Sequence, residues 1–245
     1  MDDERTQRGI ERSLRIYYDD RRDTAAMDAL YGRFVRPGDL VFDVGSHVGD
    51  RIAAFRRLGA RVIACEPNPA LAPTLRRLYG SDENVTLEAV AVGASSGTTE
   101  MRINTDNPTV STASDAFVGA AHGAAGWEGQ VWGKSIRVPM TTLDALMAAH
   151  GRPAFMKIDV EGFEAEALAG MSQPVKALSF EFTTIQRDVA RACVERCVAL
   201  GYAQFNAALG ESQELATWRT ADEILGWLNE LPHAANSGDI YARLD

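Results

Sequence analysis

The stretch LVFDVGSHVGD, residues 40–50, indicates the fold more strongly than any other part of the sequence. It opens with an almost continuous apolar run, which is typical of a strand buried on both faces of a parallel sheet. Gly45 and Gly49 follow, and glycines at the end of such a strand let the backbone approach a ligand closely. The stretch therefore predicts a strand, a ligand-binding loop and the start of a helix.

Helix and strand patterns alternate on both sides of residue 105, which predicts βαβ units and a mostly parallel sheet with helices on both faces. We expect the last two strands to lie side by side, one of them antiparallel. The expected helices cover residues 23–34, 52–58, 70–78, 143–150, 163–169, 187–200 and 221–228. The expected strands cover 40–45, 61–66, 85–92, 97–104, 154–160, 177–182, 202–209 and 237–244.

Residues 105–134 interrupt this alternation with a run rich in Gly, Ala, Ser and Thr. A segment of that length without periodicity is usually a lid or binding loop, and a disordered loop is the alternative. Phe117, Trp127 and Trp132 offer apolar anchors, so we interpret the segment as a lid-like insertion.

The amino-terminal part of the chain, residues 1–36, predicts a helical cap. Ile10, Leu14 and Tyr17 recur at the spacing of an amphipathic helix over residues 2–23. No linker or repeat is visible, and 245 residues with 46% hydrophobic content fit one α/β domain over residues 1–245.

The composition of the chain indicates which classes of partner and which cellular compartment to expect. Lys and Arg number 25 against 34 Asp and Glu, and the net charge of −9 argues against nucleic acid. No run approaches the ~20 apolar residues of a membrane helix or forms a signal-peptide core, so we expect a soluble, cytoplasmic protein. The three cysteines are too few for a disulfide scaffold. Cys193 and Cys197 are interpreted as packed on one helix face, with a metal-ligand pair as the alternative.

A nucleoside cofactor is predicted by the ends of the first two strands. Glu66 ends the second strand, where a carboxylate can accept both hydroxyls of a ribose. Asp43, Gly45 and Gly49 give the spacing Asp-x-Gly-x-x-x-Gly in place of the G-x-G-x-x-G dinucleotide pattern. A carboxylate would repel a pyrophosphate but attract an ammonium group, so this pattern favours S-adenosylmethionine over NAD. The alternative is a simple glycine turn with Glu66 solvated.

The stretch KIDVEGFE, residues 157–164, places further charged groups at a neighbouring strand end. Asp159 ends an apolar strand, where a carboxylate is costly without a function. For Glu161 the alternative is a role at the start of the next helix, where acidic residues are favoured. Lys157 is expected to form a salt bridge with Asp159 or Glu181. Glu181 lies in the apolar strand SFEF and is either in a core ion pair or an active-site acid.

Three groups are candidates for activating an acceptor hydroxyl. Asp159 is the first candidate for the base, because burial would raise its pKa. His47 is the alternative, since its ordinary pKa suits a base, although it can equally be a solvent-facing loop residue. Mg²⁺ held by Asp159 and Glu181 is a third alternative, but two carboxylates are fewer ligands than such sites usually have, so we expect no metal.

The chain resembles the FkbM family of S-adenosylmethionine-dependent methyltransferases from about residue 18 to its end. The resemblance is carried by the segments DLVFDVGSHVGD, ACEPNP, NVTLEAVAVG, TTLDAL, FMKIDVEGFEAEALAG, SFEF and SGDIYARL. It implies a class I methyltransferase fold, with a Rossmann-like seven-stranded sheet, and hydroxyl methylation of sugars or polyketide-like metabolites. The family loop often has Gly-Ala-Asn where this chain has Gly-Ser-His.

The residues, read together with this resemblance, give a set of site predictions. The expected cofactor contacts are Asp43, Gly45, Ser46, His47, Gly49, Glu66, Pro67, Asn68, Ala89 and Asp159. The expected catalytic residues are Asp159, Glu181 and His47. The expected partner is a small-molecule hydroxyl acceptor, with no nucleic acid or membrane, and a homodimer is left open.

Three other functions remain as alternatives. A nicotinamide-dependent oxidoreductase would also use an acidic residue after the second strand, but it would need the G-x-G-x-x-G pattern. A binding module that has lost its chemistry would not need Asp159 and Glu181. A nucleic-acid methyltransferase is disfavoured by the net charge and by KIDV, which stands where such enzymes commonly have a proline-rich motif.

Overall fold

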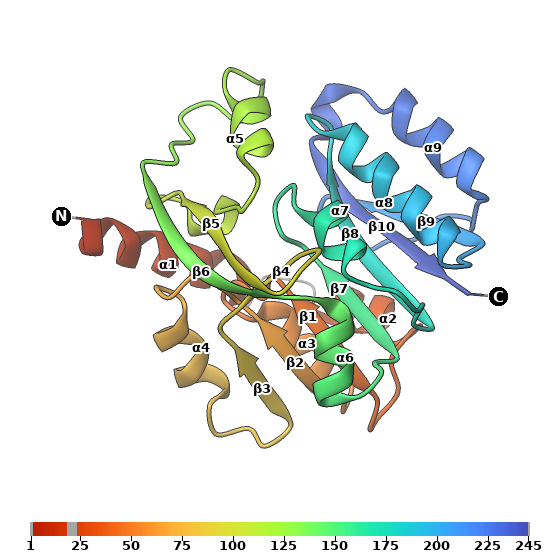
Figure 1. The fold of residues 1–245 in the computed structure, drawn as a ribbon, viewed down its shortest axis with the longest axis horizontal. Coiled ribbons are helices and arrows are strands. Elements are labelled where there is room, and N and C mark those ends of the chain that lie inside the picture. The colour runs from red at the N-terminus through yellow and green to blue at the C-terminus, as the bar shows by residue number, and fades with distance from the viewer. Residues whose placement is uncertain (1, 19–23, 245) are drawn as a thin grey trace.

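The main sheet of the protein has seven strands in the order β3-β2-β1-β7-β8-β10-β9. A computed structural model describes residues 2–18 and 24–244 (Figure 1). Only β10, of the strands in this sheet, runs antiparallel to its neighbours, so the predicted α/β sheet is confirmed, including the late antiparallel pair. The strands are β1 (Leu40–Val44), β2 (Arg61–Cys65), β3 (Val85–Glu88), β7 (Phe155–Ile158), β8 (Ala177–Thr183), β9 (Gln204–Leu209) and β10 (Ser237–Arg243).

Successive side chains of a strand point to opposite faces of the sheet. The buried strands have apolar side chains on both faces, so helices cover both faces. Val41 of β1 packs into one hydrophobic cluster and Phe42 into the other. The helices on the Val41 face are α2 (Thr24–Tyr31), α3 (Asp50–Arg57) and α4 (Ala72–Tyr79). The helices on the Phe42 face are α6 (Leu143–His150), α7 (Glu164–Ala169), α8 (Arg187–Ala199) and α9 (Ala221–Glu230). Cys193 and Cys197 are buried on α8 as unpaired thiols, which confirms their packing role.

A second sheet of three strands, in the order β4-β6-β5, was only partly predicted. The expected strand over 85–92 is wrong as one unit, because it divides into β3 of the main sheet and β4 (Ala91–Val92) of the second. β5 (Gly97–Ile103) matches the expected extra strand, whereas its antiparallel partner β6 (Lys134–Thr141) was not predicted.

Residues 105–133 connect β5 to β6 and form short elements of their own: the 3₁₀ helix η1 (Pro108–Val110) and α5 (Asp115–Ala121). Figure 1 shows this connection extending from the hairpin of β5 and β6. Phe117, Trp127 and Trp132 pack together, with the Phe117 and Trp127 ring centroids 5.1 Å apart. The three predicted anchors therefore hold one small apolar cluster.

Helix α1 (Asp2–Tyr18) lies against the same connection. Ile10 is buried with Val48 and Leu71, and Arg5 forms an ion pair with Asp106. The expected helix over 2–23 extends beyond α1, and its residues 19–23 lie outside the described residues, as does Met1 of the expected cap. Within residues 2–18 and 24–244, no helix is both long and apolar enough to cross a membrane.

Candidate functional site

A cavity lies at the carboxyl ends of β1, β2 and β7, where a doubly wound sheet binds its ligands. It encloses about 900 Å³ of space, including its opening to solvent. Most of its lining comes from the loops after these strands, from η1 and from the β4 region. The lining residues are Tyr17, Val44, Gly45, Ser46, His47, Asp50, Arg51, Cys65, Glu66, Pro67, Val90, Ala91, Val92, Met101, Pro108, Thr109, Ser111, Ala113, Lys157, Asp159, Val160, Glu161, Phe163 and Glu211.

The loop after β1 requires its glycines. Gly45 has φ +85°, and a Cβ there would lie 1.8 Å from the carbonyl oxygen of Asp159. Gly49 has φ +87°, and its Cβ would lie 2.5 Å from a ring carbon of Tyr79. Gly45 and Ser46 border the cavity, whereas Gly49 makes room for packing behind it. Close backbone approach is therefore the reason for the glycine spacing.

Glu66 is fixed at the cavity wall by backbone donors. The N–H of His47 donates to one carboxylate oxygen at 2.9 Å, and the N–H of Asn68 donates to the other at 2.8 Å. Burial raises the pKa of Glu66 to about 7 despite these two bonds. Each oxygen keeps a lone pair, so Glu66 can still accept hydroxyl groups from a ligand in the cavity.

The other predicted cofactor contacts differ in whether they reach the cavity. Pro67 lines the cavity, but Asp43 and Asn68 are buried behind it. Burial raises the pKa of Asp43 to about 7, and its Oδ2 has no hydrogen-bond partner among the described residues. Ala89 is exposed and does not border the cavity. The lining there is formed by Val90, Ala91 and Val92, which sequence reasoning missed.

His47 is partly buried and borders the cavity, so it is not the solvent-facing loop residue of the alternative. Its Nε2 is 3.4 Å from the hydroxyl of Thr109, and the edge of its ring meets Tyr17 at a centroid distance of 5.6 Å. Burial lowers the pKa of His47 to about 4. The pKa of His47 is therefore lower than the ordinary value on which its candidacy as a base was founded, and its role as a base stays a prediction.

Asp159 and Lys157 form the expected salt bridge, with Nζ and Oδ2 2.5 Å apart. Lys157 is 2% exposed, and its Nζ is also 3.8 Å from Asp239. Burial alone would raise the pKa of Asp159, but the Lys157 ammonium outweighs it and holds that pKa below its ordinary value. The prediction that burial would raise this pKa is therefore wrong, because the neighbouring cation was left out of it.

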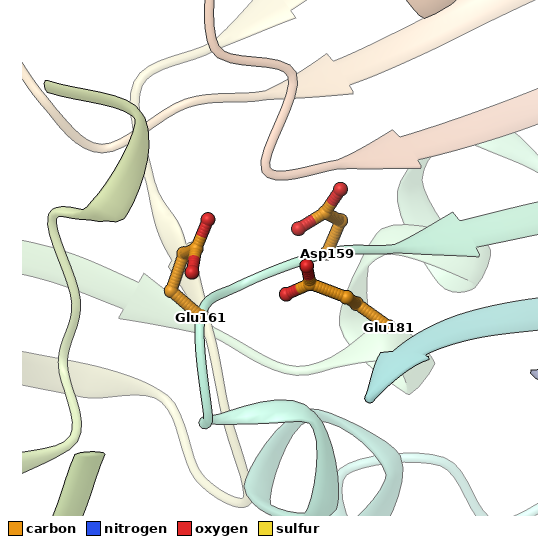
Figure 2. A group of neighbouring side chains, drawn as sticks. All are labelled: Asp159, Glu161 and Glu181. Carbon is orange, nitrogen blue, oxygen red and sulfur yellow. The ribbon is translucent and has the colours of Figure 1, made fainter. Parts of the chain in front are cut away.

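Glu161 and Glu181 meet Asp159 around one shared space (Figure 2). One oxygen of each carboxylate lies within 4.8 Å of the others. Burial and mutual repulsion among these groups raise the pKa of Glu161 and of Glu181 well above its usual range. Neither forms an ion pair with a described residue, so a core ion pair for Glu181 is not observed.

The start of α7 is stabilised by Glu164 and not by Glu161. The Glu164 carboxylate accepts from the N–H groups of Val160 at 2.9 Å and Gly162 at 3.2 Å. Glu161 precedes the helix with φ +55°, and its side chain borders the cavity. The alternative role for Glu161 at the helix start is therefore wrong. Glu161 is instead a cavity residue that was not among the predicted catalytic residues.

Three more cavity residues come from segments far apart in the sequence. Tyr17 belongs to α1, and Thr109 belongs to η1. Arg51 of α3 contacts Asp50 at 2.5 Å and both oxygens of Glu211 at 2.9 and 3.0 Å, which ties the segment after β9 to the cavity. No local pattern marks these residues, because only the fold brings them together.

Comparison with known proteins supports a methyltransferase. The methyltransferase FkbM domain matches residues 43–231. Similar solved structures include a TehB-like SAM-dependent methyltransferase from Corynebacterium glutamicum, with 10% identity, TM-score 0.48 and coverage of 96% of this chain and 94% of that chain. A precorrin-6y C5,15-methyltransferase from Geobacter metallireducens gives 13% identity, TM-score 0.44 and coverage of 91% and 87%. No curated protein matches the chain in sequence.

The domain match covers both the glycine loop after β1 and the carboxylates at the ends of β7 and β8. Strand order, the position of the cavity and the fixed Glu66 all agree with it. The chain therefore belongs to the FkbM family of S-adenosylmethionine-dependent methyltransferases.

Proposed function

We propose that the protein transfers a methyl group from S-adenosylmethionine to a hydroxyl of a small molecule, such as a sugar or a polyketide-like metabolite. The observation that carries this proposal is the position of Asp159. Its carboxylate, paired with Lys157, borders the same cavity as Glu66 and Gly45. The same cavity is thus bordered by Glu66, which can bind a ribose, and by Asp159, an ionised hydrogen-bond acceptor at another strand end.

The charged groups that line the cavity support this cofactor. Glu66 can accept the ribose hydroxyls, and Gly45 borders the cavity at the end of the neighbouring strand. Its charged lining is Asp50, Arg51, Glu66, Lys157, Asp159, Glu161 and Glu211. This excess of carboxylates favours a cationic ligand over the pyrophosphate of a dinucleotide, so the nicotinamide alternative has less support. S-adenosylmethionine supplies an electrophilic methyl group on a positively charged sulfur.

Asp159 is the residue that we expect to hold and deprotonate the acceptor hydroxyl. The Lys157 ammonium keeps it ionised, so it can accept a hydrogen bond from the hydroxyl and fix the direction of the oxygen lone pair. A carboxylate with a low pKa is a weak base. However, a hydroxyl oxygen becomes strongly acidic as it forms its new bond to carbon, so even a weak base can take the proton at that stage. His47 remains the alternative base.

The connection between β5 and β6 supports a proposed role as a lid. Pro108, Thr109, Ser111 and Ala113 from this connection line the cavity, and Tyr17 of α1 lies beside them. We propose that these two segments close over cofactor and acceptor and exclude water from the reacting centre.

The test uses S-adenosylmethionine with a labelled methyl group and a panel of hydroxyl, amine and thiol acceptors. Mass spectrometry of the products should show methyl ethers. A product methylated only at nitrogen, sulfur or carbon would overturn hydroxyl transfer. Calorimetric binding of the cofactor without transfer to any panel member, including hydroxyl acceptors of both named classes, would favour the non-catalytic module instead.

A further inference from the structure

The space between Asp159, Glu161 and Glu181 has the chemistry of a cation site (Figure 2). Asp159 follows β7, Glu161 lies in the next turn and Glu181 belongs to β8. One oxygen from each lies within 4.8 Å of the others. Two carboxylates are too few for a typical divalent site, but Glu161 brings a third oxygen donor to the same space.

When all three carboxyl groups are ionised, the neighbouring cation compensates the negative charge of this cluster only in part. Lys157 is divided between Asp159, with Nζ and Oδ2 2.5 Å apart, and Asp239, at 3.8 Å. Glu161 and Glu181 form no ion pair with any residue in 2–18 or 24–244. Carboxylates brought this close repel one another unless a cation or protons lie between them.

A second observation concerns the hydrogen bonds that these side chains lack. Glu161 is only 8% exposed, yet its carboxylate accepts no hydrogen bond from a described residue. The Oε2 atom of Glu181 is also buried without a partner. Buried polar atoms are nearly always paired, so the unpaired Glu181 oxygen, beside the largely buried Glu161 carboxylate, points to a ligand in the space they share.

The backbone holds Glu161 in this position. Its φ of +55° is in the left-handed region, which a non-glycine residue rarely adopts. The Thr112 hydroxyl donates to the carbonyl oxygen of Glu161 at 2.7 Å, which fastens this turn to the connection between β5 and β6. The fold thus fixes the backbone at Glu161, and its side chain borders the cavity.

We infer that Asp159, Glu161 and Glu181 bind one divalent cation that prefers oxygen ligands, such as Mg²⁺ or Mn²⁺. The Oδ2 atom of Asp159 stays with Lys157, which leaves Oδ1 for the cation. Three carboxylate ligands leave coordination positions for water or for an acceptor oxygen. As far as the inference rests on the proposed function, the cation would hold the acceptor hydroxyl beside Asp159 and make it more acidic.

The test titrates the whole chain with Mn²⁺, without cofactor or acceptor, and follows free Mn²⁺ by electron paramagnetic resonance. We expect one saturable site per chain. Glu161→Gln and Glu181→Gln should each raise the Mn²⁺ dissociation constant at least ~10-fold, because each removes one charged ligand. Glu166→Gln, which alters an exposed carboxylate of α7, should leave it unchanged.

Folding is controlled in the same samples. Mg²⁺ should raise the unfolding temperature of the native chain and of Glu166→Gln, but not that of Glu161→Gln. Absence of a saturable site, or equal Mn²⁺ binding by the native chain and Glu161→Gln, would overturn the inference. Since neither measurement involves methyl transfer, its failure is distinguishable from failure of the proposed function.

Discussion

Two regions at the carboxyl edge of the sheet differ in how their acidic side chains are paired: Glu66, which follows β2, and the pair of Glu161, which follows β7, and Glu181, which lies in β8. In the first region, each Glu66 oxygen accepts a backbone N–H, from His47 or from Asn68. In the second, the Glu161 carboxylate accepts no hydrogen bond from a described residue, and one oxygen of Glu181 is buried without a partner. The first region is therefore organised in advance for a ligand of fixed shape. The second has carboxylate oxygens without hydrogen-bond partners, which a bound ligand can supply.

The largest expected effect comes from the second region. Asp159→Asn should lower turnover about 10²- to 10⁴-fold, the range for loss of a general base. Affinity for S-adenosylmethionine, measured by calorimetry, should stay nearly unchanged, because Glu66 and Gly45 are intact. Asp188→Asn, at an exposed position of α8, is the matched control. Retained turnover in Asp159→Asn would move the base to His47.

The next effect tests the first region. Glu66→Ala should weaken cofactor binding, because it removes charge-assisted hydrogen bonds that contribute about 1.5 to 3 kcal/mol each. Calorimetry with S-adenosylhomocysteine measures the loss, and Glu83→Ala at an exposed turn serves as the control. The proposed placement of the ribose would be falsified if the Glu66→Ala affinity equalled that of the native chain.

A smaller effect concerns the proposed lid, the connection between β5 and β6. Cleavage within residues 105–134 by a nonspecific protease should slow several-fold when S-adenosylhomocysteine is bound, because closure reduces local opening. Rates of cleavage elsewhere in the chain provide the internal reference. The same rate in the connection with and without ligand would argue against a lid that responds to cofactor.

The last expected effect is a pH dependence of stability, to which Glu66 contributes. Burial raises its folded-state pKa from 4.5 to about 7, so the folded chain binds the proton more tightly than the unfolded chain. This contribution to stability is present below pH 4.5 and is lost as the pH rises through about 7. The unfolding temperature of the native chain should therefore fall relative to that of Glu66→Gln over this range. Parallel curves for the two chains would contradict the raised pKa.

Sequence reasoning was most successful where the determining contacts are local. The pattern of 40–50 predicts β1 and its loop because strand, glycines and helix follow one another, and Lys157 and Asp159 share a strand face at a separation of two. It failed where distant segments meet. Tertiary packing determines the pairing of β6, the contact of Arg51 with Glu211 and the place of Tyr17 at the cavity. The pKa of Asp159 depends on a balance of burial and charge that sequence spacing does not reveal.

The ends of the connection between β5 and β6 are neighbours, since Ile103 of β5 pairs with Lys134 of β6. Changes of sequence between two paired strand ends are tolerated better than changes within the strands themselves. This connection also supplies cavity residues such as Thr109 and Ser111. Substitutions at such cavity residues would therefore reshape the wall of the cavity while the pairing of β5 with β6 is kept, which offers a route to new acceptors.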